Sequence, residues 1–428
     1  MIRKFVVLLR RMHGRIRSVL EGIHPAQCQT YPADCSRLTG KPELIPKCPK
    51  SRIFGKFTLY RSSRRGLFPG GRPDRSESAS FGDIPSPLDS VLWLSMPVLD
   101  YDSIKRGMAI IAVLGMLAPL NSLAEIIDYH QHLYSPQAGA RSSPGPKGID
   151  ADYLVAQLDA AGISRAVILS VAYSFSNPNK AAVPNEYAHV MDENNWTSAQ
   201  VAKYPHRLLG FCSVNPLRPY ALQEIARCAR DPNLRAGLKL HFGNSDVNVD
   251  NPDHLARVRR VFRAANEHQM AIVVHMHANI DHHRPYGAKE ARIFLEQLLP
   301  ESPDVVVQIA HLAGGGGYDD PETDAALSVF VKAIERKDPR MKNVYFDVCG
   351  IAIPGMWEDK ADLLVTRIRQ IGTNRLVYGS DAATADNTPK DVLKRWHSLP
   401  LTQKEFRAID NNVAPYVRNW VLAGESQR

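Results

Sequence analysis

Eight short apolar runs, separated by longer amphipathic stretches, are the feature that most constrains the fold of this chain. Each run is only a few mostly aliphatic or β-branched residues long, which is typical of strands that are buried on both faces. Because strand and helix alternate over all the repeats, the pattern predicts a parallel sheet that closes into a (β/α)₈ or TIM barrel. The runs begin at Glu125, Arg165, Arg207, Arg235, Met270, Asp304, Asn343 and Arg375.

The stretches between the runs have the amphipathic pattern of helices, and two segments are rich in residues typical of loops. Long loops are expected at 135–148 and 177–185. Both loops follow predicted strands, so they are expected to overhang the mouth of the barrel, where active sites lie. Helices are expected at 150–161, 220–229, 253–268, 288–299, 323–336 and 360–371, with 402–418 as a final helix that closes the fold.

The barrel is expected to span residues 125–423, and the segment before it has a different composition. Residues 1–124 contain 19 Lys and Arg against 9 Asp and Glu, whereas the remainder contains 34 against 35. Residues 1–95, rich in Arg, Pro, Ser and Gly, are predicted to be disordered, or to precede a true translation start at Met96 or Met108. Since the basic excess is confined to this segment, the barrel itself is not expected to bind nucleic acid.

Residues 96–124 have the design of a secretory signal peptide. Two basic residues come first, an apolar run follows at 108–120, and Ser122 and Ala124 occupy the −3 and −1 positions of a cleavage site. The apolar run is short for a transmembrane helix, so we expect a secreted or periplasmic protein without a membrane span after processing. The alternatives are a membrane anchor and, in an unprocessed cytoplasmic protein, a buried helix.

None of the six cysteines stands in the CxxC spacing of a zinc finger or a redox motif. Cys212 and Cys349 lie in apolar, strand-like runs, which favours small buried thiols. No disulfide framework is therefore expected.

Metal-ligating residue types collect where the predicted strands end. Catalytic groups of such barrels lie at the carboxyl ends of the strands, and residues two apart in a strand point to the same face. An imidazole or a charge inside an apolar strand is costly unless it is paired or bound to a metal. Three histidines and a carboxylate suit one Zn²⁺ ion best, with Mn²⁺, Co²⁺ or Fe²⁺ as alternatives. The residues concerned are His130, His132, Lys239, His241, His275, His277, His311 and Asp381.

Four short motifs carry several of these residues. They are Asp-Tyr-His-Gln-His at 128–132, Val-His at 274–275, Ala-His-Leu-Ala-Gly-Gly at 310–315 and Tyr-Gly-Ser-Asp at 378–381. Together with a strand entry at 204–216 they resemble the amidohydrolase superfamily, in particular the amidohydrolase-related branch that includes aminocarboxymuconate-semialdehyde decarboxylase. The resemblance covers residues 125–420 and depends on the order and spacing of the motifs rather than on any one of them.

The resemblance implies a role for each matching residue. His130, His132 and His275 would bind the metal, with His277 as the alternative to His275. His311 would polarise the substrate or help to activate water. Asp381 would contact the metal and act as the general base.

Three other residues near the predicted mouth have less definite roles. Lys239 is either an electrostatic group for the substrate or, when carbamylated as in binuclear relatives, a bridge between two metal ions. His241 is a rim residue in the mononuclear pattern. Arg284 is either a bidentate clamp for a substrate carboxylate or part of a solvated loop.

These assignments favour a metal-dependent hydrolase of a small molecule. Metal-activated water would attack the carbonyl carbon of an amide, ester or lactone and so cleave a C–N or C–O bond. The alternative is a metal-dependent, non-oxidative decarboxylase of a small carboxylic acid, because both reactions use the same ligands. A second alternative is a secreted binding protein without turnover. A small molecule is the expected partner, and the sequence leaves homo-oligomerisation open.

Overall fold

The computed structural model describes residues 125–425 except 143, 279–283, 319, 353–356 and 383. The predicted extension at 1–95 and the signal-like segment at 96–124 lie outside the described residues. Among the residues that are described, no helix is both long and apolar enough to cross a membrane. The description therefore covers the predicted barrel.

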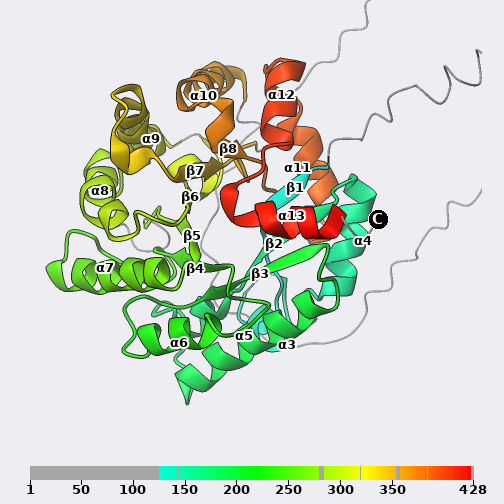
Figure 1. Ribbon diagram of the computed structural model, residues 1–428, viewed down its shortest axis with the longest axis vertical. Coiled ribbons are helices and arrows are strands. Elements are labelled where there is room, and N and C mark those ends of the chain that lie inside the picture. Colours follow the sequence, from blue (N-terminus) through cyan, green and yellow to red (C-terminus); the bar gives the residue numbers. More distant parts are fainter. Residues whose placement is uncertain are drawn as a thin grey trace, which may run out of the picture. The chain divides into compact units, whose positions relative to one another are not determined.

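Eight parallel strands form one sheet in which each strand pairs with the next one in the sequence. Figure 1 shows them as a ring with the helices outside it. Two backbone hydrogen bonds, from Tyr129 N to Tyr378 O and from Asp381 N to His130 O, join the last strand to the first. The predicted TIM barrel is confirmed. The strands are β1 Ile127–Gln131, β2 Arg165–Leu169, β3 Leu208–Ser213, β4 Gly237–His241, β5 Ala271–His275, β6 Val307–Ile309, β7 Val344–Asp347 and β8 Leu376–Val377.

Most of the predicted helices form close to their expected bounds and cover the outside of the ring (Figure 1). The predicted helix at 288–299 begins as α8 (Ala288–Ile293) and continues as a π-helical turn at Phe294–Leu298. The loop predicted after β1 contains one short helix, α3 (Pro136–Ala140). The other expected helices are α4 Ala151–Ala161, α6 Ala221–Cys228, α7 Pro252–Glu267, α9 Pro321–Glu335 and α10 Trp357–Ile371.

Two helices were not expected from the sequence, α5 (Glu186–Ala202) and α11 (Pro389–Trp396). The buried residues of α5 include the polar Glu193, Asn194 and Thr197. A helix that buries polar side chains lacks the apolar period by which helices are recognised, which explains why α5 was missed.

The end of the chain also differs from the prediction. Instead of one helix at 402–418 there are two, α12 (Gln403–Asp410) and α13 (Arg418–Glu425). Pro415 lies between them and has no amide hydrogen with which to continue a helix. It begins a 3₁₀ turn instead. Ala414 and Val417 pack with strand residues in an apolar cluster, and Figure 1 shows α13 over the side of the ring where β1 and β2 lie. The segment between the two helices therefore plugs the barrel.

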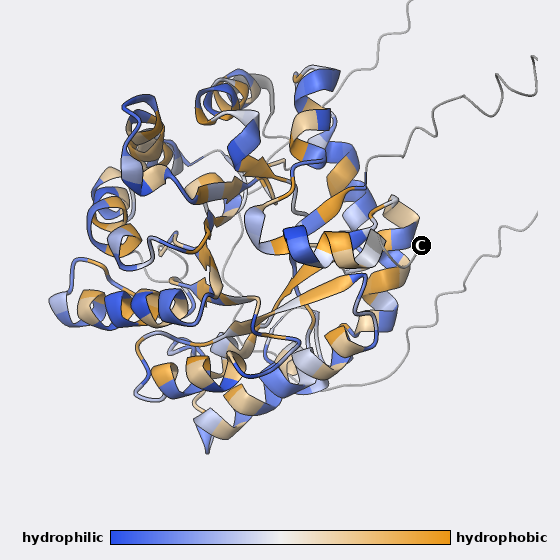
Figure 2. Cartoon of the chain, in the orientation of Figure 1, coloured by the Kyte–Doolittle hydropathy of each residue, from blue (hydrophilic) through white to orange (hydrophobic). Residues whose placement is uncertain are grey.

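Apolar strand residues alternate between two layers. Leu238 and Leu240 pack outward with residues of the helices, whereas Val167 and Val273 belong to the inner cluster. In Figure 2 the strands are hydrophobic and the helices present hydrophilic residues to the outside. Because successive strand residues point to opposite faces, the residue between the two leucines, Lys239, faces the barrel interior.

Cys212 and Cys228 form a disulfide, which corrects the expectation of free thiols without a disulfide framework. Cys212 lies on β3 and Cys228 ends α6, and both are buried. Their separation of 16 residues reflects how α6 folds back on its strand, which the spacing of cysteines alone does not indicate. Cys349 is free and buried, as expected.

Removal of the disulfide is expected to destabilise the barrel. A cross-link that closes a loop of this size stabilises a protein by roughly 3 kcal/mol, mainly by restricting the unfolded chain. The double variant Cys212→Ala/Cys228→Ala should unfold at a lower urea concentration than the wild type. Dithiothreitol should shift the wild-type curve in the same direction and leave the double variant unchanged. A wild-type curve that the reductant does not move would contradict the disulfide.

Candidate metal centre

Five of the predicted histidines meet at the carboxyl edge of the barrel. The ring of His130 lies 5.2 Å from that of His132 and 4.9 Å from that of His311, measured between centroids. His275 lies 5.0 Å from His311 and stacks on His241 at 4.1 Å. The structure therefore brings together side chains from the ends of β1, β4, β5 and β6. We call this group the histidine cluster.

A β-bulge in β1 allows two consecutive side chains to reach the barrel interior. Between Asp128 and Gln131 the pairing with β2 is irregular, and β1 contains one extra residue. Such bulges re-aim side chains and are common beside active sites. Tyr129 joins the inner apolar cluster, and His130 nevertheless joins the histidine cluster. A regular strand would have placed only one of the two inside.

The carboxylate of Asp128 holds this bulge in place. It accepts hydrogen bonds from the backbone nitrogens of His130 at 3.1 Å and Ser380 at 2.9 Å. The side-chain amide of Gln131 donates to the same carboxylate at 2.9 Å. Asp128 thus ties the end of β1 to the segment that follows β8.

In three histidines of the cluster the Nδ1 nitrogen faces an oxygen that can only accept a hydrogen bond. Such a partner fixes the proton on Nδ1, so Nε2 keeps the lone pair that binds a metal ion. The pairs are His130 Nδ1 with Asp347 Oδ2 at 3.0 Å, His132 Nδ1 with Leu169 O at 2.6 Å and His311 Nδ1 with Cys349 O at 2.9 Å.

Asp381 faces the free nitrogens of two of these rings. Its Oδ1 lies 3.6 Å from His132 Nε2 and its Oδ2 lies 3.8 Å from His311 Nε2. Desolvation opposes ionisation of Asp381, but the three imidazoles of His130, His132 and His311 hold its pKa below the ordinary value. The left-handed φ of 52° at this residue is strained for a side chain other than glycine, and it turns the carboxylate toward the cluster.

The donor set fits a divalent metal ion. His130, His311, Cys349 and Asp381 each offer a ligand atom, and these atoms all lie within 4.8 Å of one another. The buried Nδ1 atom of His275 has no hydrogen-bond partner among the described residues. A buried polar atom without a partner is costly unless a ligand binds it, so the Nδ1 of His275 can accept a ligand beside this group.

Lys239 lies inside the histidine cluster and is nearly fully buried. Its Nζ is 3.0 Å from His130 Nε2 and donates to the lone pair that a bound metal ion would take over. Burial lowers the pKa of Lys239, whereas Asp381 and Asp347 raise it. Burial also lowers the pKa of His132 to about 3. The His132 ring is therefore neutral, which is the form that binds a metal.

Three residues predicted to line the site have other partners. His241 stays in the cluster, but its Nδ1 accepts a hydrogen bond, so its proton lies on Nε2. The side chains of His277 and Arg284 bind carboxylates outside the cluster. The partners are Asn244 N for His241 Nδ1 at 3.1 Å, Asp320 Oδ2 for His277 Nε2 at 3.1 Å and Asp246 Oδ1 for Arg284 Nε at 2.7 Å.

Sequence reasoning missed the contribution of β7. Asp347 ends this strand, and its place at the end of a predicted strand was the signal that could have revealed it. The Cys349 thiol donates to Asp347 Oδ1 at 2.9 Å, and its Sγ lies 3.1 Å from His130 Nδ1. Cys349, expected to be a small buried thiol, therefore lies within the site. The neighbouring Gly379 cannot carry a side chain, because a Cβ there would lie 2.9 Å from the Cβ of His130.

A cavity of about 230 Å³ lies beside the histidine cluster. His132 and Asp381 form part of its lining, together with Tyr134 and Ile149 from the segment that follows β1. The two residues that flank the predicted loop at 135–148 thus line this cavity.

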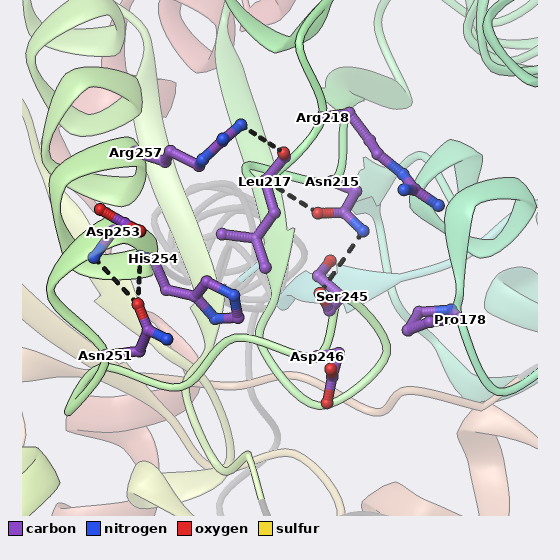
Figure 3. Close-up of a pocket in the computed structure, with 10 residues that line it drawn as sticks. All are labelled: Pro178, Asn215, Leu217, Arg218, Ser245, Asp246, Asn251, Asp253, His254 and Arg257. Carbon is purple, nitrogen blue, oxygen red and sulfur yellow. Dashed lines mark hydrogen bonds between the residues drawn. The ribbon is translucent and has the colours of Figure 1, made fainter.

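A second hollow, of about 370 Å³, lies among the loops after β2, β3 and β4 and the start of α7 (Figure 3). Figure 3 shows Ser245 between Arg218 on one side and His254 on the other. No residue of the histidine cluster lines this hollow, so it is not where the predicted chemistry would occur.

Comparison with known proteins agrees with this geometry. The model of the amidohydrolase family matches residues 127–412. The chain belongs to the amidohydrolase family. The match runs from the start of β1 to the segment that plugs the barrel and therefore includes every strand. No curated protein sequence matches this amidohydrolase.

Several solved structures are similar to this amidohydrolase in fold. The 2,6-dihydroxybenzoate decarboxylase from Rhizobium is 16% identical with a TM-score of 0.48, covering 70% of this chain and 99% of that chain. The 5-carboxyvanillate decarboxylase from Novosphingobium aromaticivorans, solved with manganese, is 15% identical with a TM-score of 0.48, covering 70% and 96%. An amidohydrolase from Burkholderia multivorans with bound zinc is 14% identical with a TM-score of 0.44, covering 67% and 96%.

The main functional expectation from the sequence, hydrolysis of a C–N or C–O bond, is corrected here. Decarboxylases of 2,6-dihydroxybenzoate and 5-carboxyvanillate are among the similar structures. Their reactions agree with the alternative, decarboxylation, and not with the main expectation. Membership of an enzyme family stands, whereas the assignment to the hydrolases does not.

The hydrogen bonds of the histidines predict which of them a metal ion needs. His132→Asn should weaken metal binding at least about tenfold, because the Nε2 that faces Asp381 is lost. His277→Asn is the matched control, because His277 binds Asp320 instead. Metal content by mass spectrometry and chelator competition measure the difference. Equal loss of metal in both variants would contradict the site described here.

Proposed function

We propose that this member of the amidohydrolase family is a decarboxylase. It would remove carbon dioxide from a small carboxylic acid, without an oxidant, at one divalent metal ion. His130, His132 and Asp381 would hold the ion together with His311 or His275. Zinc is the simplest choice for a site of imidazoles and a carboxylate. The bound ion would act as a Lewis acid that holds and polarises the substrate.

The observation that carries this proposal is the presence of Lys239 within the histidine cluster. Lys239 is 1% exposed, and its Nζ lies 3.0 Å from His130 Nε2, the nitrogen that would bind the ion. With a divalent ion bound, the ion and Lys239 would present positive charge to the cavity that Asp381 alone does not balance, because Asp347 and Asp128 already pair with donors behind the histidines. An enclosed net charge is costly unless a counter-ion balances it. A substrate carboxylate supplies that counter-ion, whereas a neutral amide, ester or lactone does not.

The cavity beside the cluster suits a small acid. Its volume of about 230 Å³ lies below the range of roughly 300–1,000 Å³ that is usual for drug-sized ligands. The substrate carboxylate would point toward Lys239, and the body of the molecule would lie against Tyr134 and Ile149. The Nε2 proton of His241 would donate a hydrogen bond to the substrate at the carboxyl edge of the barrel.

Asp381 is placed to manage the proton of this reaction. Decarboxylation breaks the bond between the carboxyl carbon and its neighbour, releases carbon dioxide and leaves the electron pair on that neighbouring carbon. A proton must then reach this carbon, and Asp381 can pass one on from solvent because it lies in the wall of the cavity. Carboxylate and proton thus give carbon dioxide and the protonated product, with no net consumption of water.

Metal-loaded protein is expected to release labelled carbon dioxide from at least one member of a panel of small aromatic and aliphatic acids labelled at the carboxyl carbon. Lys239→Met should raise KM for the acid by about 10- to 100-fold, because a hydrogen bond to a charged group contributes about 1.5–3 kcal/mol. Asp381→Asn should lower kcat by about 10²- to 10⁴-fold through loss of proton transfer.

The matched control for the lysine variant is Lys289→Met. Lys289 is exposed and pairs with Asp250 outside the cluster, so its loss should leave KM unchanged. Cleavage of a neutral ester or amide by the wild type, with no carbon dioxide released from any acid, would contradict the proposal. So would a KM in Lys239→Met equal to that of the control.

We also propose that the mature protein is exported. The Cys212–Cys228 disulfide supports export, because disulfides persist in oxidising compartments and are rare in the cytosol. The signal-like segment at 96–124 supports it independently. Amino-terminal sequencing of the native protein is expected to find a start directly after Ala124. Full-length chain in the cytosolic fraction would contradict export.

A further inference from the structure

A chain of hydrogen bonds runs through the barrel from its plug to the histidine cluster. The hydroxyl of Tyr416 donates to Gln308 Oε1 at 2.6 Å. The amide of Gln308 donates to Asp347 Oδ2 at 2.8 Å, and the same oxygen lies 3.0 Å from His130 Nδ1. Three short contacts therefore connect a residue near the end of the sequence to a predicted metal ligand at its beginning.

The lower end of this chain is firmly held. Tyr416 belongs to the 3₁₀ turn of the plug, and its ring packs edge-on against Tyr129 and Phe211 with centroid distances of 6.0 and 5.4 Å. The Tyr129 hydroxyl in turn accepts a hydrogen bond from Ala414 N at 3.0 Å and donates one to Asn412 O at 3.1 Å. The plug is thus fixed to β1 at the bulge itself.

The direction of every hydrogen bond in the chain is determined by chemistry. A carboxylate only accepts, so Gln308 must turn its NH₂ group toward Asp347 and its oxygen toward Tyr416. The Tyr416 hydroxyl must then donate, and burial, with Tyr129 and the Asp347 carboxylate nearby, raises its pKa well above the ordinary value, so the hydroxyl keeps its proton. If the Gln308 amide were flipped, its oxygen would face the carboxylate of Asp347, and neither of these two acceptors could donate a hydrogen bond.

The other oxygen of Asp347 has its own donors. Oδ1 accepts from His311 N at 2.8 Å and from the Cys349 thiol at 2.9 Å. Because both of its oxygens accept hydrogen bonds, the Asp347 carboxylate is held in one orientation. His130 can donate to it only when the proton of the ring is on Nδ1. Carboxylates that hold a metal-binding histidine in this way raise metal affinity, and their loss typically costs about 10- to 100-fold.

We propose that Tyr416 and Gln308 are positioning residues of the metal centre. They hold Asp347, and through it the tautomer and orientation of His130, so that the closing segment of the chain sets the affinity of a site at the opposite end of the barrel. The inference rests on the metal centre of the proposed function but not on the reaction carried out there.

Two variants test the chain, with Zn²⁺ alone as the probe. Gln308→Met preserves the approximate volume of the side chain and removes the donor to Asp347, so the Kd for Zn²⁺ should rise about tenfold or more. Tyr416→Phe preserves the ring packing and removes the hydroxyl, and Kd should rise several-fold. Because Tyr416 acts through Gln308, the double variant should bind Zn²⁺ no more weakly than Gln308→Met alone.

Tyr345→Phe is the matched control. Tyr345 lies on β7 and packs against the same inner apolar cluster as Tyr416, but it is not part of the chain of hydrogen bonds. Its replacement should leave Kd unchanged. Thermal unfolding of the metal-free variants reports separately on packing, and a lower melting temperature with an unchanged Kd would assign Tyr416 a structural role alone.

The proposal is overturned if folded Tyr416→Phe and Gln308→Met both bind Zn²⁺ within twofold of the wild type, if their effects simply add, or if Tyr345→Phe weakens binding equally. Should Gln308→Met not fold, the comparison of Tyr416→Phe with Tyr345→Phe decides alone. Wild-type protein that binds Zn²⁺ but releases no carbon dioxide would refute the reaction and leave this inference intact. Wild-type protein without Zn²⁺ affinity would refute both.

Discussion

The carboxylate of Asp347, enclosed at the centre of the barrel, is the group on which the rest of the site depends. It accepts hydrogen bonds from Gln308, from His311 N and from the Cys349 thiol, and it faces His130 Nδ1. A buried carboxylate without partners would be unstable by several kcal/mol, so these donors cannot move independently. One anion therefore fixes the relative positions of the ends of β1, β6 and β7.

Backbone strain accompanies this arrangement. His311, Leu312 and Ala313 adopt left-handed φ values of 54°, 51° and 67°, and Asp381 one of 52°. Each such residue costs on the order of 1–3 kcal/mol and persists only where surrounding contacts enforce it. The hydrogen bonds from His311 N to Asp347 and from Asp381 N to His130 O supply such contacts. The strain thus lies where strand ends turn their side chains toward a metal ion.

Much of the fold could be predicted because it follows from local patterns. Buried parallel strands read as short apolar runs, and each predicted run contains an observed strand. Prediction failed where the buried side chains are polar. In α5 the buried face contains Glu193 and Asn194, whose hydrogen bonds to Ser135 and to β3 replace apolar contacts. The Cys212–Cys228 disulfide escaped prediction because it joins a strand to the helix that packs on it.

The sequence by itself determined which residues reach the mouth of the barrel, because period-two alternation and closure of a parallel sheet place strand ends at one edge. It could not decide which nitrogen of each ring carries a proton, nor that His277 turns to Asp320 while His130 turns to Asp347. Only the tertiary structure decided these, through the β1 bulge and the closed ring. The physical reason is that the alternation of side chains along a strand depends on neighbouring residues of the chain. The hydrogen-bond partners of a side chain depend instead on distances between strands, and these are set only when the barrel closes.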